Sequence, residues 1–211
     1  SDDPRVRAQT IKTLLALPLA LDVKAQILAK LPVEKAHEQT VRQALISMGN
    51  NSYKPMLSVL RSAPRHLHPR AVFVLKRLYL STSALIRMLT DQCLSIRVVA
   101  AERLETSYKL RVGKALISIL VMSLGDESSI VRGASALALG EIQTAVDKPV
   151  IRSLLKLLND KDGRVRWRAV RALGKVGKGD PAVLEALQAM TTDPSRRLII
   201  ELKLALKMLK K

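Results

Sequence analysis

Histidine and cysteine are the side chains of this sequence best suited to hold a transition metal. His66, His68 and Cys93 are the candidates. Two histidines at positions i and i+2 do not share a helix face, and no second cluster supplies further ligands. The ligand spacings typical of zinc sites are also absent. The sequence therefore predicts no metal site.

A glycine- and lysine-rich segment, residues 174–179, has the composition of a phosphate-binding loop. It lacks the Gly-x-x-x-x-Gly-Lys-Ser/Thr pattern, and no predicted strand precedes it. No nucleophile–base pair and no pair of carboxylates stands out elsewhere in the sequence. From the sequence alone we expect no catalytic residue, no cofactor and no enzymatic activity.

Basic side chains form the most distinctive pattern. Arg164, Arg168, Arg171 and Lys175 follow one another at spacings of four, three and four, which places them on one stripe of a helix. Like charges in such a row repel, so acidic neighbours or an anionic partner must offset them. The simpler interpretation is that these side chains are exposed to solvent. The more specific interpretation is that they form a stripe that binds a partner. The residues predicted to bind a partner are Arg132, Arg164, Arg168, Arg171, Lys175, Trp167, Arg97 and Arg70.

Trp167 is the only tryptophan of the chain, and it lies next to the basic stripe. An indole ring there can stack on a partner, or it can pack between neighbouring helices, which is the more common role. The sequence leaves both interpretations open.

The segment that carries the stripe, residues 160–174, is repeated along the chain. It is predicted to form a turn capped by Asp162, followed by a helix whose apolar face contains Val165, Ala169, Ala172 and Leu173. The same pattern occurs 34 residues earlier, in 126–140, and 33 residues later, from residue 193 onward. A period of this length indicates a helical-repeat protein.

The repeat pattern predicts pairs of helices and no strands. First helices are expected at about 20–31, 53–62, 83–90, 109–124, 149–159 and 181–191. Second helices are expected at about 3–16, 36–48, 69–80, 94–107, 128–143, 162–176 and 195–210. Most of the prolines and glycines fall at or near the predicted helix ends, as this assignment requires. The predicted fold class is all-α.

The pattern Asp-x-x-x-x-Val-Arg-x-x-Ala-x-x-Ala-Leu-Gly, seen in 160–174 and 126–140 and in part in 91–104, resembles a short HEAT repeat. Repeats of this kind resemble those of bilin lyases and of many bacterial scaffold proteins. The resemblance implies a right-handed α-α superhelix of about six to seven stacked helical hairpins. It also implies that the turn aspartate and the arginine of each Val-Arg pair join neighbouring repeats. These arginines are Arg7, Arg42, Arg97, Arg132 and Arg166.

Composition and charge limit the range of partners. The 211 residues include 36 Lys and Arg against 18 Asp and Glu, a formal charge of +18 that favours anionic partners. Aromatic residues make up 2%, so the core must consist of Leu, Val, Ile and Ala. No signal peptide is visible, and the longest apolar run is too short to span a membrane. We expect one repeat domain over 1–211 in a cytoplasmic protein, and the opening within a repeat suggests that it is part of a longer chain.

These observations favour a non-catalytic scaffold that docks an acidic protein surface or peptide on a basic concave face. Two alternatives remain: binding of the nucleic-acid duplex backbone, and a role as an accessory subunit of a bilin lyase. An anionic membrane surface is a weaker candidate. The sequence predicts no oligomeric state.

Overall fold

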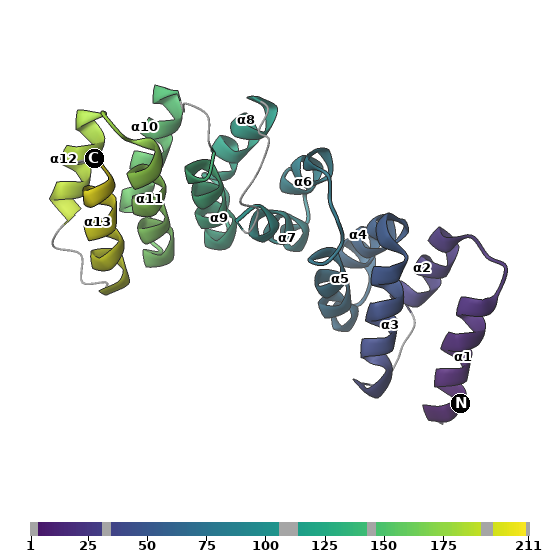
Figure 1. Cartoon of the computed structure of the whole chain (residues 1–211). Helices are drawn as coiled ribbons and strands as arrows, with labels where there is room; N and C mark the ends of the chain where they lie inside the picture. Colours follow the sequence, from purple (N-terminus) through teal and green to yellow (C-terminus); the bar gives the residue numbers. More distant parts are fainter. Residues whose placement is uncertain (1–3, 31–34, 106–113, 143–146, 191–195, 210–211) are drawn as a thin grey trace. The chain divides into compact units, whose positions relative to one another are not determined.

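The chain folds into helices that form two compact units, Ser1–Ser81 and Thr82–Lys211, in the computed structural model (Figure 1). The structure describes residues 4–30, 35–105, 114–142, 147–190 and 196–209. Within these ranges the regular elements are all helical. None of the described helices is both long and apolar enough to cross a membrane. One continuous solenoid over 1–211 stays a prediction.

In its described residues, the first unit contains five α-helices of 8 to 13 residues. The bounds are α1 (Pro4–Ala16), α2 (Leu21–Lys30), α3 (Lys35–Ser47), α4 (Tyr53–Ser62) and α5 (His68–Leu75). In this unit α2 packs on α4, α3 packs on α5, and α4 packs on α5. The helices therefore stack as neighbouring pairs.

The second unit contains four helix pairs in chain order. Their bounds are α6 (Thr82–Leu89) with α7 (Leu94–Glu105), α8 (Lys114–Ser123) with α9 (Ser129–Gly140), α10 (Lys148–Lys156) with α11 (Gly163–Val176), and α12 (Pro181–Ala189) with α13 (Arg196–Leu209). The second helices of successive pairs also pack on each other, so α7, α9, α11 and α13 form one layer (Figure 1). We call this layer the second-helix layer.

The predicted helices agree closely with the observed ones. Most ends differ by no more than three residues, and the larger difference falls on α5, which ends at Leu75. The predicted helix residues 109–113, before α8, lie outside the described residues. Asp162 caps α11 as expected: its side chain accepts a hydrogen bond from the backbone N–H of Arg164 at 2.8 Å. The all-α prediction is confirmed.

The buried core of the second unit follows the repeat register. Val131, Val165 and Leu198 occupy equivalent positions in three successive second helices, and all are fully buried. Ala138, Ala172 and Ala205 form a second equivalent set and are also buried. Each helix therefore presents the same small and branched side chains to its neighbours, as a stack of similar units requires.

Glycine sets the close spacing of the second-helix layer. A Cβ atom built on Gly140 would lie 2.7 Å from the Cα of Ala172, and one built on Gly174 would lie 2.8 Å from the Cα of Ala205. Both contacts are to backbone, which cannot move aside as the end of a flexible side chain can. The absence of a side chain at these two positions lets α9, α11 and α13 approach one another closely.

We predict that Gly140→Ala lowers the free energy of unfolding by about 1–3 kcal/mol, because the new methyl group would overlap the backbone of α11. Gly125→Ala is the matched control, since a Cβ there meets only the Met122 carbonyl oxygen, at 3.6 Å. The backbone of Gly125 has no positive φ, so alanine should be neutral or stabilising by about 0.4–1 kcal/mol. Urea denaturation of the three proteins measures the difference. Equal losses in both variants would contradict the close-packing argument.

Candidate functional site

On α7 and on α9, one arginine clamps two neighbouring repeats together. In Arg132, Nε and Nη2 donate to the two carboxylate oxygens of Asp160 in the next repeat, at 2.7 and 2.8 Å. Its Nη1 donates to the carbonyl oxygens of Asp126 and Glu127, in the turn of its own repeat, at 2.9 and 3.0 Å. One guanidinium group thus satisfies two turns at once, with the bidentate geometry that suits a carboxylate. We call this arrangement the aspartate–arginine clamp.

The same clamp recurs one repeat earlier. Arg97 donates to Asp126 through Nε at 2.7 Å and to the carbonyl oxygen of Asp91 through Nη1 at 3.0 Å. Arg166 makes one half of the same arrangement, the contact with its own turn: its Nη1 donates to the carbonyl oxygen of Asp160 at 2.9 Å. The equivalent carboxylate, Asp193, lies outside the described residues. The expected joining role of the Val-Arg pairs is confirmed for Arg97 and Arg132.

Each clamp aspartate also shapes its own turn. The carboxylates of Asp91, Asp126 and Asp160 accept a hydrogen bond from the backbone N–H two residues later, at 2.8 to 2.9 Å. This is the local geometry that favours aspartate at turns before a helix. Asp126 and Asp160 are therefore used twice, once to form the turn and once to receive the arginine of the preceding repeat.

A different arginine cluster joins the helices of the first unit. Arg70 on α5 is buried and donates to Glu38 on α3, with its closest contact at 2.7 Å, and to the carbonyl oxygen of Leu28 on α2 at 2.9 Å. Arg42 donates to the same carboxylate at 3.0 Å and lies 4.6 Å from the ring centre of Phe73. Arg42 thus binds within its own helix and unit, in a pattern unlike the clamps of the second unit.

These ion pairs shift the pKa values of the groups involved. The hydrogen bond from Arg132 lowers the pKa of Asp160, against the opposing effect of burial. The hydrogen bond to Asp160 in turn raises the pKa of Arg132. For Glu38, burial acts to raise the pKa, but the contacts with Arg70 and Arg42 together outweigh it and leave the pKa lowered. All three groups are held in their charged forms.

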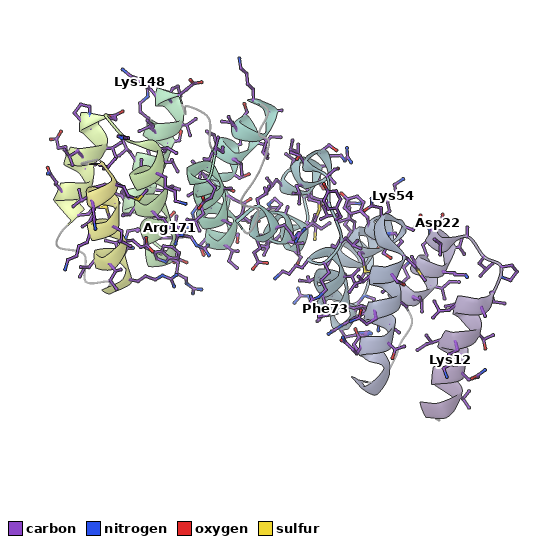
Figure 2. All side chains as sticks on the ribbon, in the orientation of Figure 1. Lys12, Asp22, Lys54, Phe73, Lys148 and Arg171 are labelled. Carbon is purple, nitrogen blue, oxygen red and sulfur yellow. The ribbon has the colours of Figure 1, made fainter. Side chains whose placement is uncertain are left out.

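The predicted basic stripe of α11 is used largely inside the stack. Lys175 forms an ion pair with Glu141 at the end of α9, and Arg171 (labelled in Figure 2) lies 3.7 Å from Glu201 on α13. The side chain of Arg168 fills the space over Gly133, where a Cβ would come within 2.8 Å of it. Arg164 points to solvent, with its side chain 82% exposed. Acidic neighbours therefore offset part of the repulsion along the stripe.

The remaining predicted binding residues are also engaged in the fold. Trp167 is buried, and the guanidinium of Arg197 on α13 lies over its ring at 4.0 Å from the ring centre. Arg70, Arg97 and Arg132 hold their carboxylates as described. A partner-binding role for these four residues stays a prediction, but their contacts are those of packing and clamping.

A shallow groove of about 290 Å³ lies between α11 and α13 on the second-helix layer. Its lining is basic and apolar: Arg171, Lys175, Glu201, Leu204, Lys207 and Met208. Leu204 and Met208 are 52% and 43% exposed, which is high for large apolar side chains. We call this feature the α11–α13 groove. Arg171 and Lys175, the α11 wall of the groove, were predicted as binding residues, whereas Leu204, Lys207 and Met208 were not.

A second groove, of about 670 Å³, lies between α10 and the start of α12. It includes Lys178 from the glycine-rich segment 174–179, which has the composition of a phosphate-binding loop without its sequence pattern. The lining residues belong to helices and to the turn between α11 and α12.

The structure gives no grounds for a metal site in the described part of the chain. No group of three or more His, Cys, Asp and Glu side chains lies close enough together there to hold a metal ion. His68 instead makes a hydrogen-bond contact from Nε2 to the carbonyl oxygen of Ala63, at 3.1 Å.

The fold and clamps define a protein built of stacked helical repeats. A designed armadillo repeat protein of known structure has the same kind of fold, with a TM-score of 0.53, 18% identity, and coverage of 95% of this chain and 98% of that one. More specifically, residues 117–207 match the family model for HEAT repeats. The expected HEAT-type repeats are therefore confirmed for this part of the chain.

Two curated relatives carry the name of an enzyme. The chain is 37% identical over 84 residues to the deoxyhypusine hydroxylase of Bos taurus and 34% identical over 84 residues to that of Gallus gallus. The match covers 39% of this chain and 26% of each relative, so the chain spans about a quarter of the length of the relatives it matches.

This similarity corrects the functional expectation from the sequence. The prediction of a non-catalytic scaffold, with its nucleic-acid and bilin-lyase alternatives, and the prediction of no enzymatic activity are contradicted, because the curated relatives are enzymes. The error came from inferring function from the composition of one repeated motif. The repeats maintain the fold and say little about chemistry carried elsewhere.

Removal of one clamp should destabilise the second unit. Arg132→Met is expected to lower the free energy of unfolding by about 3–5 kcal/mol, because it leaves the buried Asp160 carboxylate without its partner. Arg164→Met removes the same charge from an exposed position and should change stability by no more than about 0.5 kcal/mol. Denaturant unfolding of both variants measures the two losses in the free energy of unfolding. Equal losses would contradict a stabilising role for the clamp.

The lowered pKa of Asp160 predicts acid sensitivity. Its contribution to stability is complete above the ordinary carboxyl pKa of about 3.9 and is lost as the pH falls through the lower folded-state value. The Asp160→Asn variant has no proton to bind there, so it should lose less stability than the native chain between about pH 5 and pH 2. Urea midpoints measured across this range test the expectation. Parallel pH profiles would show that Asp160 does not contribute.

Proposed function

We propose that the chain supplies the substrate-holding repeats of an enzyme related to deoxyhypusine hydroxylases. The similarity to two such enzymes is the observation that carries this proposal. The stacked second helices add a physical basis, since a row of parallel helices offers an extended surface for another polypeptide. A cytoplasmic location remains part of the proposal.

The α11–α13 groove is the part of the surface that we propose holds the substrate. Lys207 is exposed at its edge, and Leu204 and Met208 offer apolar contact beside it. Glu201 is the one carboxylate among the lining residues, and it already faces Arg171. Such a lining suits a protein segment in which acidic residues alternate with apolar ones.

Charge complementarity supports an acidic substrate in particular. The chain carries a formal charge of +18, and that excess steers acidic segments toward it at low ionic strength. Apolar anchors such as Leu204 and Met208 would then slow dissociation, because binding energy concentrates in a few buried contacts. In this proposal the cationic side chains attract the substrate, and Leu204 and Met208 hold it once it is bound.

A fluorescent acidic peptide that contains leucine residues and one deoxyhypusine is the test substrate. We predict that Lys207→Glu weakens its binding by about five- to tenfold at low salt, because an attraction becomes a repulsion. Leu204→Gln should weaken it by about threefold or more, with little dependence on salt. Fluorescence anisotropy measures both effects. Lys114→Glu, an equal charge change at an exposed position on α8, is the matched control.

Mass spectrometry of the same peptide, after incubation with protein, tests the enzymatic half of the proposal. A hydroxylase inserts one oxygen atom into a C–H bond of the deoxyhypusine residue. The incubation therefore includes molecular oxygen and a two-electron reductant, and the second oxygen atom leaves as water. Unchanged mass would argue against this reaction for the chain. Binding that is equally weakened by Lys114→Glu would argue against the α11–α13 groove as the docking site.

A further inference from the structure

We propose that the groove between α10 and α12 binds a small organic phosphate monoester. This α10–α12 groove is lined by α10, by the turn after α11 and by the first residues of α12. Its volume of about 670 Å³ lies within the range of small-molecule sites. The inference does not depend on the proposed hydroxylase relationship or on the α11–α13 groove.

One face of α10 supplies most of the lining. Lys148, Ile151, Arg152 and Leu155 have the i, i+3, i+4, i+7 spacing that places side chains on one side of a helix. Lys148, labelled in Figure 2, lies at the beginning of α10. This face therefore offers two cationic groups with apolar side chains between and after them.

The turn between α11 and α12 supplies the opposite wall. Lys178 adds a third cation, and Gly179 next to it has φ of +80°, a backbone conformation suited to glycine. Asp180 is the only carboxylate in the lining, and it accepts a hydrogen bond from the backbone N–H of Ala182 at 3.0 Å. Its role as the cap of α12 explains its presence beside the cations.

The three cations have no carboxylate partner in the described part of the chain. Lys148, Arg152 and Lys178 take part in none of the ion pairs found there, unlike Arg132, Arg171 and Lys175. With Asp180 included, the lining carries a formal charge of +2. A phosphate monoester carries about −1.5 to −2 near neutral pH, so it matches this charge.

One feature of α10 runs against local preference. Its first turn carries a lysine and no acidic residue, although Asp147 at the N-cap supplies the negative charge that the helix dipole favours. Lys148 and Arg152 form a like-charged i, i+4 pair, which destabilises a helix by about 0.2–0.5 kcal/mol. Departures of this kind from local preference are expected where side chains serve a ligand.

The apolar lining explains why the ligand should be organic. Ile151 in the lining is buried, and the other apolar lining residues are Leu155, Val176, Pro181 and Ala182. The planar guanidinium of Arg152 can bind two phosphate oxygens at once, while the lysines act as point charges. The phosphate is therefore assigned to the cationic rim and the organic group to the apolar lining.

Isothermal titration calorimetry with phenyl phosphate tests the proposal on the whole chain. We expect saturable binding to one site. Arg152→Gln and Lys178→Gln should each weaken it by about tenfold, the loss of one charge-assisted hydrogen bond. Lys156→Gln, on the same helix but outside the groove lining, should change the affinity by less than about twofold. Circular dichroism checks that the variants keep their helices.

Inorganic phosphate and benzoate are the comparison ligands: the first tests the role of the apolar lining, and the second tests the preference for phosphate. Both should bind more weakly than phenyl phosphate, the first because it lacks the apolar group and the second because it carries a single charge. Absence of saturable phenyl phosphate binding would overturn the proposal, and so would an equal loss in Lys156→Gln. Equal affinity for inorganic phosphate would refute the role of the apolar lining, and equal affinity for benzoate would refute the preference for phosphate.

Discussion

The aspartate–arginine clamp is the interaction on which the second unit depends. A single carboxylate such as that of Asp160 shapes the turn before its own helix and receives the arginine of the preceding repeat. Because both contacts use the same side chain, the turn and the boundary between repeats are fixed together. Arg132 in turn reaches back to carbonyl groups of its own turn, which leaves few polar groups of these turns without partners.

Close contact between second helices is the complementary constraint. Gly140 and Gly174 allow the backbones of neighbouring helices to approach, and the alanines opposite them keep the interface thin. Aromatic side chains would hold the helices farther apart, which fits an aromatic content of 2%. The contact of Arg132 with Asp160 acts at the turns and Gly140 acts along the helices, so the boundary between α9 and α11 is fixed at two places.

The sequence predicted the helices well because their signals are local. Capping aspartates, prolines at helix starts and apolar residues at helical spacing all depend on a few neighbouring residues, as Asp162 and Val165 illustrate. The site was harder to predict because it depends on which repeat faces which. Arg171 and Lys175 could not be known to meet Glu201 and Glu141 without the register between helices. The exposure of Leu204 and the gathering of Lys178 with α10 likewise follow from tertiary packing.

The position of Trp167 has a practical consequence. The only indole of the chain is buried in α11 and covered by Arg197 of α13. Its intrinsic fluorescence therefore reports on the surroundings of α11, including its contact with α13, while far-ultraviolet dichroism reports on all helices. Comparison of the two optical signals during unfolding would reveal whether α13 separates from α11 before the other helices melt.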